Sequence, residues 1–171
     1  PGCLPQLEAM VNDSAIRVAY QATLSLGQFK DNTVIPALAK SLDLHGNSSW
    51  FRSAVLSSEA GSGADLLKTL EKNLFFKDTA SWKLKFIETC SNVIGARNER
   101  SKIESVLDNL SQPYIANTAG LKEASVKGLI KGLEKPEGSD DAIKEKLKNI
   151  SSEAGSNIAK VIQNLKELYA K

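Results

Sequence analysis

An apolar stripe at helical spacing, closed at both ends by capping residues, recurs along this chain and restricts what it can fold into. Its first copy covers residues 14–27, SAIRVAYQATLSLG, with a stripe made of Ile16, Ala19, Tyr20, Thr23 and Leu24. Asp13 or Ser14 is placed to cap the first turn, and Gly27 to end the helix in the left-handed conformation. A second stripe runs over residues 33–42, with Pro36 in the first turn, where its missing N–H costs little. The pattern predicts two helices joined by a short turn.

The same pattern returns further along the chain. Arg52 lies 35 residues after Arg17 (52 minus 17), and later stripes follow at similar intervals. We divide the sequence into repeats at about 12–46, 47–77, 78–112 and 113–150, followed by a final helix at 152–170. Because each helical hairpin has one apolar stripe per helix, it cannot form a closed core alone and must lie against the next hairpin.

No stretch has the alternation of a β-strand, so the sequence predicts an all-α fold. The irregular repeat length favours a right-handed α-α superhelix, a HEAT/armadillo-like solenoid of about four helical hairpins that forms one domain over residues 1–171. An irregular helical bundle would use the same stripes and stays open as the alternative. Residues 2–10 resemble the tail of a helix whose partner is missing, so we expect a segment of a longer chain.

Composition and charge argue against two classes of partner. Hydrophobic residues make up 42% of the chain and charged residues 25%, which is ordinary for a soluble globular protein. The net charge of +2 is small and the lysines are interspersed with glutamates, so no basic stripe suits a nucleic acid. No apolar run approaches the length that spans a bilayer. We therefore expect no nucleic-acid partner and no membrane span in this segment.

The sequence contains no catalytic or metal-binding constellation. His45 is the sole histidine and has no companion ligands at metal-binding spacing, which predicts a surface loop residue. Cys3 and Cys90 lie far apart without a CxxC motif, which favours two free thiols over a disulfide. Asp140 and Asp141 are adjacent at a predicted helix start, where capping suits them better than acid–base chemistry. We expect no enzyme activity and no cofactor in this segment.

Several stretches resemble one known family. Residues 17–27, 34–39 and 50–58, followed by IGARN at 94–98 and GLIKGL at 128–133, are similar to the HEAT-repeat segment of large bacterial multidomain haem-binding proteins. In that family the segment separates a membrane-bound dehydrogenase-like β-propeller from a c-type cytochrome domain, beyond the cytoplasmic membrane. This chain has neither CxxCH nor propeller strands. The resemblance implies the helical scaffold alone, and an extracytoplasmic location in the periplasm or cell envelope.

Two functions are consistent with these features. The first is a non-catalytic helical-repeat scaffold for protein–protein or interdomain interaction. The alternative is a structural spacer domain of an extracytoplasmic dehydrogenase/cytochrome c electron-transfer protein. The expected partners are a protein or neighbouring domains of the same chain. The expected partner surface consists of polar positions on the second helices, Lys40, Lys68, Lys72 and Lys102.

A further set of residues marks equivalent positions in the repeats and is expected to be structural. Its members are Arg17, Gly27, Trp50, Arg52, Trp82, Gly95, Gly128 and Gly132. We expect the arginines to pair with an acid or a carbonyl of a neighbouring repeat; the alternative is a basic ladder, completed by Lys122, for an acidic partner. We expect the two tryptophans to pack in the core at the hairpin junctions; the alternative is that they are exposed anchors for a partner.

Overall fold

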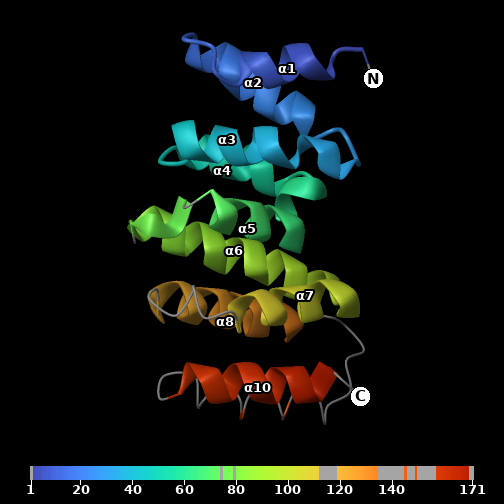
Figure 1. The fold of residues 1–171 in the computed structure, drawn as a ribbon, viewed down its shortest axis with the longest axis vertical. Helices are drawn as coiled ribbons and strands as arrows, with labels where there is room; N and C mark the ends of the chain where they lie inside the picture. Colours follow the sequence, from blue (N-terminus) through green and yellow to red (C-terminus); the bar gives the residue numbers. More distant parts are fainter. Residues whose placement is uncertain are drawn as a thin grey trace. The chain divides into compact units, whose positions relative to one another are not determined.

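The computed structural model describes residues 2–73, 75–78, 80–111, 119–134, 145, 149 and 157–169. Within these residues the chain forms helices connected by turns (Figure 1). No β-strand occurs in these ranges, which confirms the predicted all-α class. The chain divides into two compact units, Pro1–Lys77 (unit 1) and Asp78–Lys171 (unit 2). The division falls where the sequence places the end of the second hairpin.

Unit 1 consists of short helices connected by turns. Its α-helices are α1 (Leu4–Met10), α2 (Ile16–Leu26), α3 (Ile35–His45), α4 (Ser49–Leu56) and α5 (Ala64–Lys72). Three single 3₁₀ turns accompany them, η1 (Asn32–Val34), η2 (Ala60–Ser62) and η3 (Phe75–Lys77). Helices α2 and α3 correspond to the first predicted pair, and Pro36 lies in the first turn of α3 as predicted.

The ends of α2 differ from the prediction. Gly27 has φ −65° and ψ −14°, so it continues the right-handed conformation and does not form a left-handed cap. A Cβ atom at Gly27 would lie 3.0 Å from Cβ of Ser58, which follows α4, so the glycine allows close packing at this point. Asp13 Oδ1 accepts a hydrogen bond from the Ala15 N–H at 2.7 Å, one residue before the helix begins.

Helices of unit 1 pack in two layers. The first helices of successive pairs, α2 and α4, contact each other, and so do the second helices, α3 and α5. Contacts of α3 with α2 and α4 join the layers. The buried side chains between them include Ala19, Ala22, Leu26, Leu38, Leu42, Ala54, Val55, Leu66 and Leu70. Helices α2 to α5 thus bury their apolar stripes against several neighbours.

A pair of buried hydroxyl groups joins α2 to α3. Thr23 Oγ1 donates to the Ala19 carbonyl oxygen at 2.9 Å and lies 2.7 Å from Ser41 Oγ. Both side chains are fully buried, so these hydrogen bonds satisfy polar atoms that water cannot reach.

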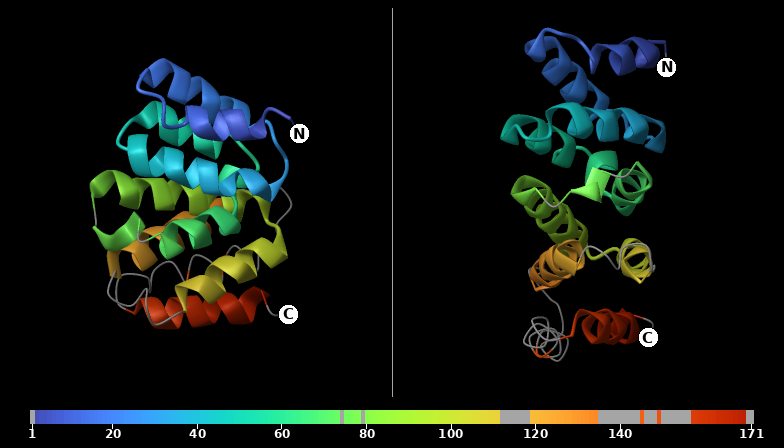
Figure 2. Two further views of the ribbon diagram at one scale, coloured as in Figure 1. Left: turned by 45° about the horizontal axis from the view of Figure 1, so that its top comes forward. Right: turned by 60° about the vertical axis from the view of Figure 1, so that its left-hand side comes forward.

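Unit 2 repeats the two-layer packing with longer helices. Its described helices are α6 (Ser81–Arg97), α7 (Arg100–Leu110), α8 (Ala119–Leu133) and α10 (Ile158–Tyr169). Helix α6 packs on α8, and α7 packs on α10 (Figure 2). Asn98, in the left-handed conformation with φ 52°, ends α6 and starts the turn to α7.

Helix α7 buries an apolar stripe at helical spacing, made of Ile103, Val106, Leu107 and Leu110. Most of the predicted fourth repeat, including Asp140 and Asp141, lies outside the described residues.

Candidate functional site

Trp50 lies at the surface of unit 1. Its side chain is 71% exposed, and its ring packs edge-on against Tyr20, with ring centroids 6.5 Å apart and an interplanar angle of 84°. Tyr20 in turn packs against buried Phe51, with centroids 5.4 Å apart. The prediction that Trp50 packs in the core is wrong, because Phe51 occupies the buried position at the start of α4. Trp82 is half-buried at the start of α6.

His45 is a packing residue rather than the surface loop residue that the sequence predicts. It is the last residue of α3, and its ring lies against Phe51 with centroids 4.5 Å apart. Its Nε2 atom lies 3.3 Å from the Val11 carbonyl oxygen, where a protonated Nε2 donates a hydrogen bond. His45 therefore connects the end of α3 to the turn after α1.

The two arginines at equivalent positions have different surroundings. The Arg52 guanidinium donates to the carbonyl oxygens of Gly46 and Asn47, at 2.7 and 2.9 Å. It thereby stabilises the turn that leads from α3 into α4, at the boundary between the first and second predicted repeats. Arg17 is exposed on α2.

In unit 2 a lysine occupies the corresponding basic position. Lys83 Nζ lies 2.8 Å from Asp78 Oδ2 and 5.6 Å from the centre of the Trp82 ring. The hydrogen bond from Lys83 is the main reason that the pKa of Asp78 lies below its ordinary value.

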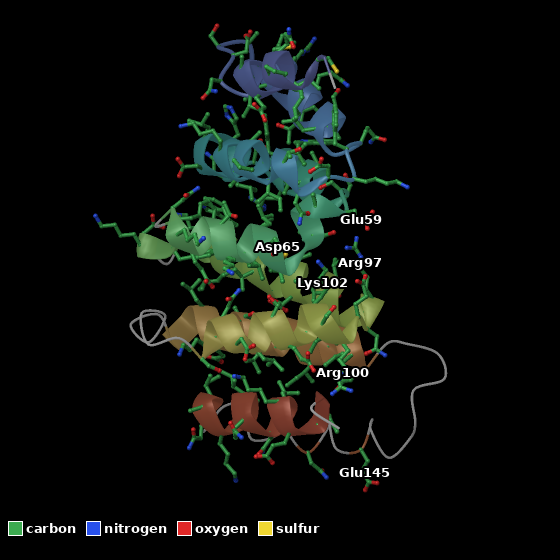
Figure 3. All side chains as sticks on the ribbon, turned by 45° about the vertical axis from the view of Figure 1, so that its right-hand side comes forward. Glu59, Asp65, Arg97, Arg100, Lys102 and Glu145 are labelled. Atoms are coloured by element: carbon green, nitrogen blue, oxygen red, sulfur yellow. The ribbon has the colours of Figure 1, made fainter. Side chains whose placement is uncertain are left out.

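The four lysines of the predicted partner surface divide between the two units. Lys40 on α3 and Lys68 and Lys72 on α5 are exposed in unit 1, on helices that contact each other. Lys102, labelled in Figure 3, is half-buried on α7 of unit 2. The role of these lysines as a partner surface stays a prediction.

Acidic side chains accompany these three lysines. Asp65, also labelled in Figure 3, lies in the first turn of α5 and accepts a hydrogen bond from Asn32 at 3.2 Å. Burial raises the pKa of Glu71 to about 7, and nearby Lys68 offsets part of that rise. The Glu71 Oε2 atom is buried and has no hydrogen-bond partner within the described part of the chain. The α3–α5 face therefore carries both signs of charge.

The crossing of α6 and α8 depends on three of the predicted structural glycines. A Cβ atom on Gly128 would lie 2.1 Å from the Glu88 carbonyl oxygen, and one on Gly132 would lie 2.2 Å from that of Asn92. From the other helix, a Cβ on Gly95 would lie 2.4 Å from the Leu129 carbonyl oxygen. The obstructing atoms belong to the backbone, so the two helices touch main chain to main chain.

A second buried hydroxyl pair lies on the same crossing. Ser91 Oγ on α6 and Ser125 Oγ on α8 are 2.8 Å apart, and both side chains are buried. The sequence predicted only a structural role for these glycines, and this crossing was not predicted. The signal was the four-residue spacing of Gly128 and Gly132, which places two residues without a Cβ atom on one helical face.

Comparisons with known proteins assign no family or function to this chain. No protein family, curated protein or solved structure matches the chain. In the part of the chain that the structure describes, no helix is long and apolar enough to cross a membrane. The same described residues contain no group of three or more His, Cys, Asp or Glu side chains arranged to hold a metal ion.

Both cysteines have free thiols, as predicted. Cys3 is exposed, whereas burial raises the pKa of the Cys90 thiol to about 12, with Arg97 lowering it in part. Because the thiolate is the reactive form, Cys90 is a packing residue and does not serve as a nucleophile at neutral pH.

Proposed function

We propose that this chain is a helical-repeat scaffold of the HEAT/armadillo-like kind, an α-solenoid segment that binds a partner protein or a neighbouring domain. The observation that carries this proposal is the pairing of alternate helices within each unit. Helix α2 packs on α4 and α3 on α5, and in unit 2 α6 packs on α8. Stacked hairpins produce this order, because each hairpin covers the apolar stripes of the one before it.

The distribution of exposed apolar side chains supports a binding role. Four large apolar side chains are exposed in the described part of the chain, Met10, Ile16, Leu44 and Trp50, and all of them belong to unit 1. Exposed tryptophan is over-represented among residues that dominate binding energy at protein interfaces. Unit 1 is therefore the half of the chain in which we expect the partner to bind.

A binding experiment with the full chain tests the scaffold proposal. The immobilised chain is used to recover proteins from an extract of its source cells, and each recovered protein is then purified and titrated against the chain. We expect at least one protein to bind with a Kd below about 100 µM. The proposal fails if no purified candidate binds the chain in that range.

The predicted lysine surface has its own test. Lys68→Glu and Lys72→Glu together reverse the charge at two exposed positions of α5 without changing a buried residue. A loss of affinity for the purified partner supports the lysine surface, whereas unchanged affinity rejects it and leaves the scaffold proposal intact. Fractionation of cells that make the natural protein tests the proposed extracytoplasmic location.

A further inference from the structure

The most distinctive exposed surface in unit 1 lies on the first helices, away from the predicted lysines. Trp50 at the start of α4 is 71% exposed and Ile16 at the start of α2 is 54% exposed. Tyr20 lies between them, because it contacts the Trp50 ring and stands one helical turn after Ile16. We call Ile16, Arg17, Tyr20 and Trp50 the Trp50 patch.

The patch is held in place from below. Tyr20 packs at 71° against Phe51, which is 2% exposed, and Phe51 also stacks on His45. The Trp50 ring is thus supported edge-on by a side chain that is itself anchored in the core. A supported aromatic ring loses little conformational freedom when a ligand covers it, so its exposed face suits binding.

The charged residues of α2 and α4 themselves have one sign. The sequences of α2 and α4 contain two charged residues, Arg17 and Arg52, and no acid. Arg17 lies three residues before Tyr20, on the same face of α2, and is exposed. The acid before α2 is Asp13, and its carboxylate accepts the Ala15 N–H. The first-helix layer therefore differs from α3 and α5, which carry both signs of charge.

We propose that the Trp50 patch binds an acidic segment of a partner protein, in which a large apolar side chain is flanked by aspartate or glutamate. This inference rests on the scaffold function proposed above and specifies the partner. The apolar side chain covers the exposed faces of Trp50 and Ile16, and a flanking carboxylate pairs with the Arg17 guanidinium. Tryptophan and arginine are the residue types that most often dominate an interface, and arginine matches a carboxylate with two parallel hydrogen bonds.

Selection from a random linear peptide library, displayed on phage and panned against the full chain, tests the proposal without assuming a partner. We expect the selected peptides to combine acidic residues with an aliphatic or aromatic residue. Their affinities are then measured by fluorescence anisotropy. Trp50→Ala and Arg17→Glu should each weaken binding about tenfold or more.

The matched control is Lys68→Glu, which makes the same kind of charge reversal on exposed α5 of the same unit and should leave binding unchanged. Trp50 and Arg17 are exposed, so their variants should keep the far-UV circular dichroism spectrum of the wild type. A variant that loses this spectrum is replaced by Trp50→Gln or Arg17→Gln, for which the same loss of binding is expected.

Three results would overturn the inference. The first is selection of peptides without acidic residues, or of no peptides at all. The second is binding that survives Trp50→Ala but is lost with Lys68→Glu, which would leave the scaffold function standing and move its surface to α5. The third is a Trp50-dependent dimer in sedimentation equilibrium, since the occupant of the patch would then be a second copy of the chain.

Discussion

Replacing Gly128 by alanine should force α6 and α8 apart. The new Cβ would lie 2.1 Å from the Glu88 carbonyl oxygen, 2.8 Å from its carbon and 3.0 Å from Glu88 Cα. Ordinary contacts of a Cβ atom fall between 3.4 and 4 Å, so the backbone of α6 must move by roughly 1 Å or more. The clash involves main chain, and no side-chain rotation can relieve it.

Two costs and one gain set the expected change in the free energy of unfolding. Overpacking of a tight interface costs about 1 to 3 kcal/mol, and separation of the helices also lengthens the buried Ser91–Ser125 hydrogen bond, which contributes about 1 kcal/mol. Alanine gains about 0.8 to 1 kcal/mol over glycine in helix propensity. We therefore expect Gly128→Ala to lower the free energy of unfolding of unit 2 by about 1 to 3 kcal/mol.

Gly120 provides the matched control on the same helix. A Cβ there would meet Leu84 Cδ2 at 3.8 Å, which is ordinary contact. Gly120→Ala keeps the propensity gain without the clash, and it should be neutral or stabilising by up to about 1 kcal/mol.

Urea unfolding measures both variants. The measurement uses a Trp50→Phe background, so that fluorescence comes from Trp82 on α6 and reports on unit 2. Circular dichroism of the same samples follows the whole chain. The main-chain contact is refuted if Gly128→Ala is as stable as Gly120→Ala.

Three further outcomes follow from buried polar and titratable groups. Folding favours the neutral carboxyl of Glu71, so its contribution to stability is present below pH 4.5 and is lost as the pH rises towards 7. Glu71→Gln should match the wild type near pH 4 and exceed it by about 1 to 2 kcal/mol at pH 8 in urea unfolding, after allowing for solvent screening of this half-buried group. An equal difference at both pH values would contradict the raised pKa. Thr23→Val leaves the Ser41 hydroxyl buried without its partner and should cost about 1 to 3 kcal/mol in the same assay, part of which Thr23→Val with Ser41→Ala restores. Ellman's reagent at pH 8 should titrate Cys3 in the folded chain and Cys90 only after addition of urea, and rapid reaction of both thiols in buffer would show that Cys90 is accessible.

Helix positions were predictable because the apolar stripes are regular. The stripe at 33–42 predicted α3, and Pro36 marked its first turn. Exact ends were less predictable, since tertiary contacts decide them. Gly27 was assigned a left-handed cap from its residue type alone, whereas its small size serves the close approach of Ser58.

Burial of individual aromatic residues could not be predicted from the sequence. Trp50 and Phe51 are adjacent in sequence, and both are large and apolar, so either could have taken the buried position of α4. A shift of one residue, about 100° around the helix, decides which ring faces the core. His45 was assigned to a loop for a similar reason, because its contacts with Val11 and Phe51 involve residues far from it in the sequence or outside its own helix.

The crossing of α6 and α8 limits how this chain can change in evolution or in the laboratory. Every amino acid other than glycine adds at least one carbon at the points where the two main chains touch. Replacements at Gly95, Gly128 and Gly132 should therefore each lower the stability of unit 2, and a saturation mutagenesis library selected for stability should be depleted at these sites irrespective of the chemistry introduced. Gly120, on the same helix, should accept many residues, so the tolerance profile along α8 would map the line of contact.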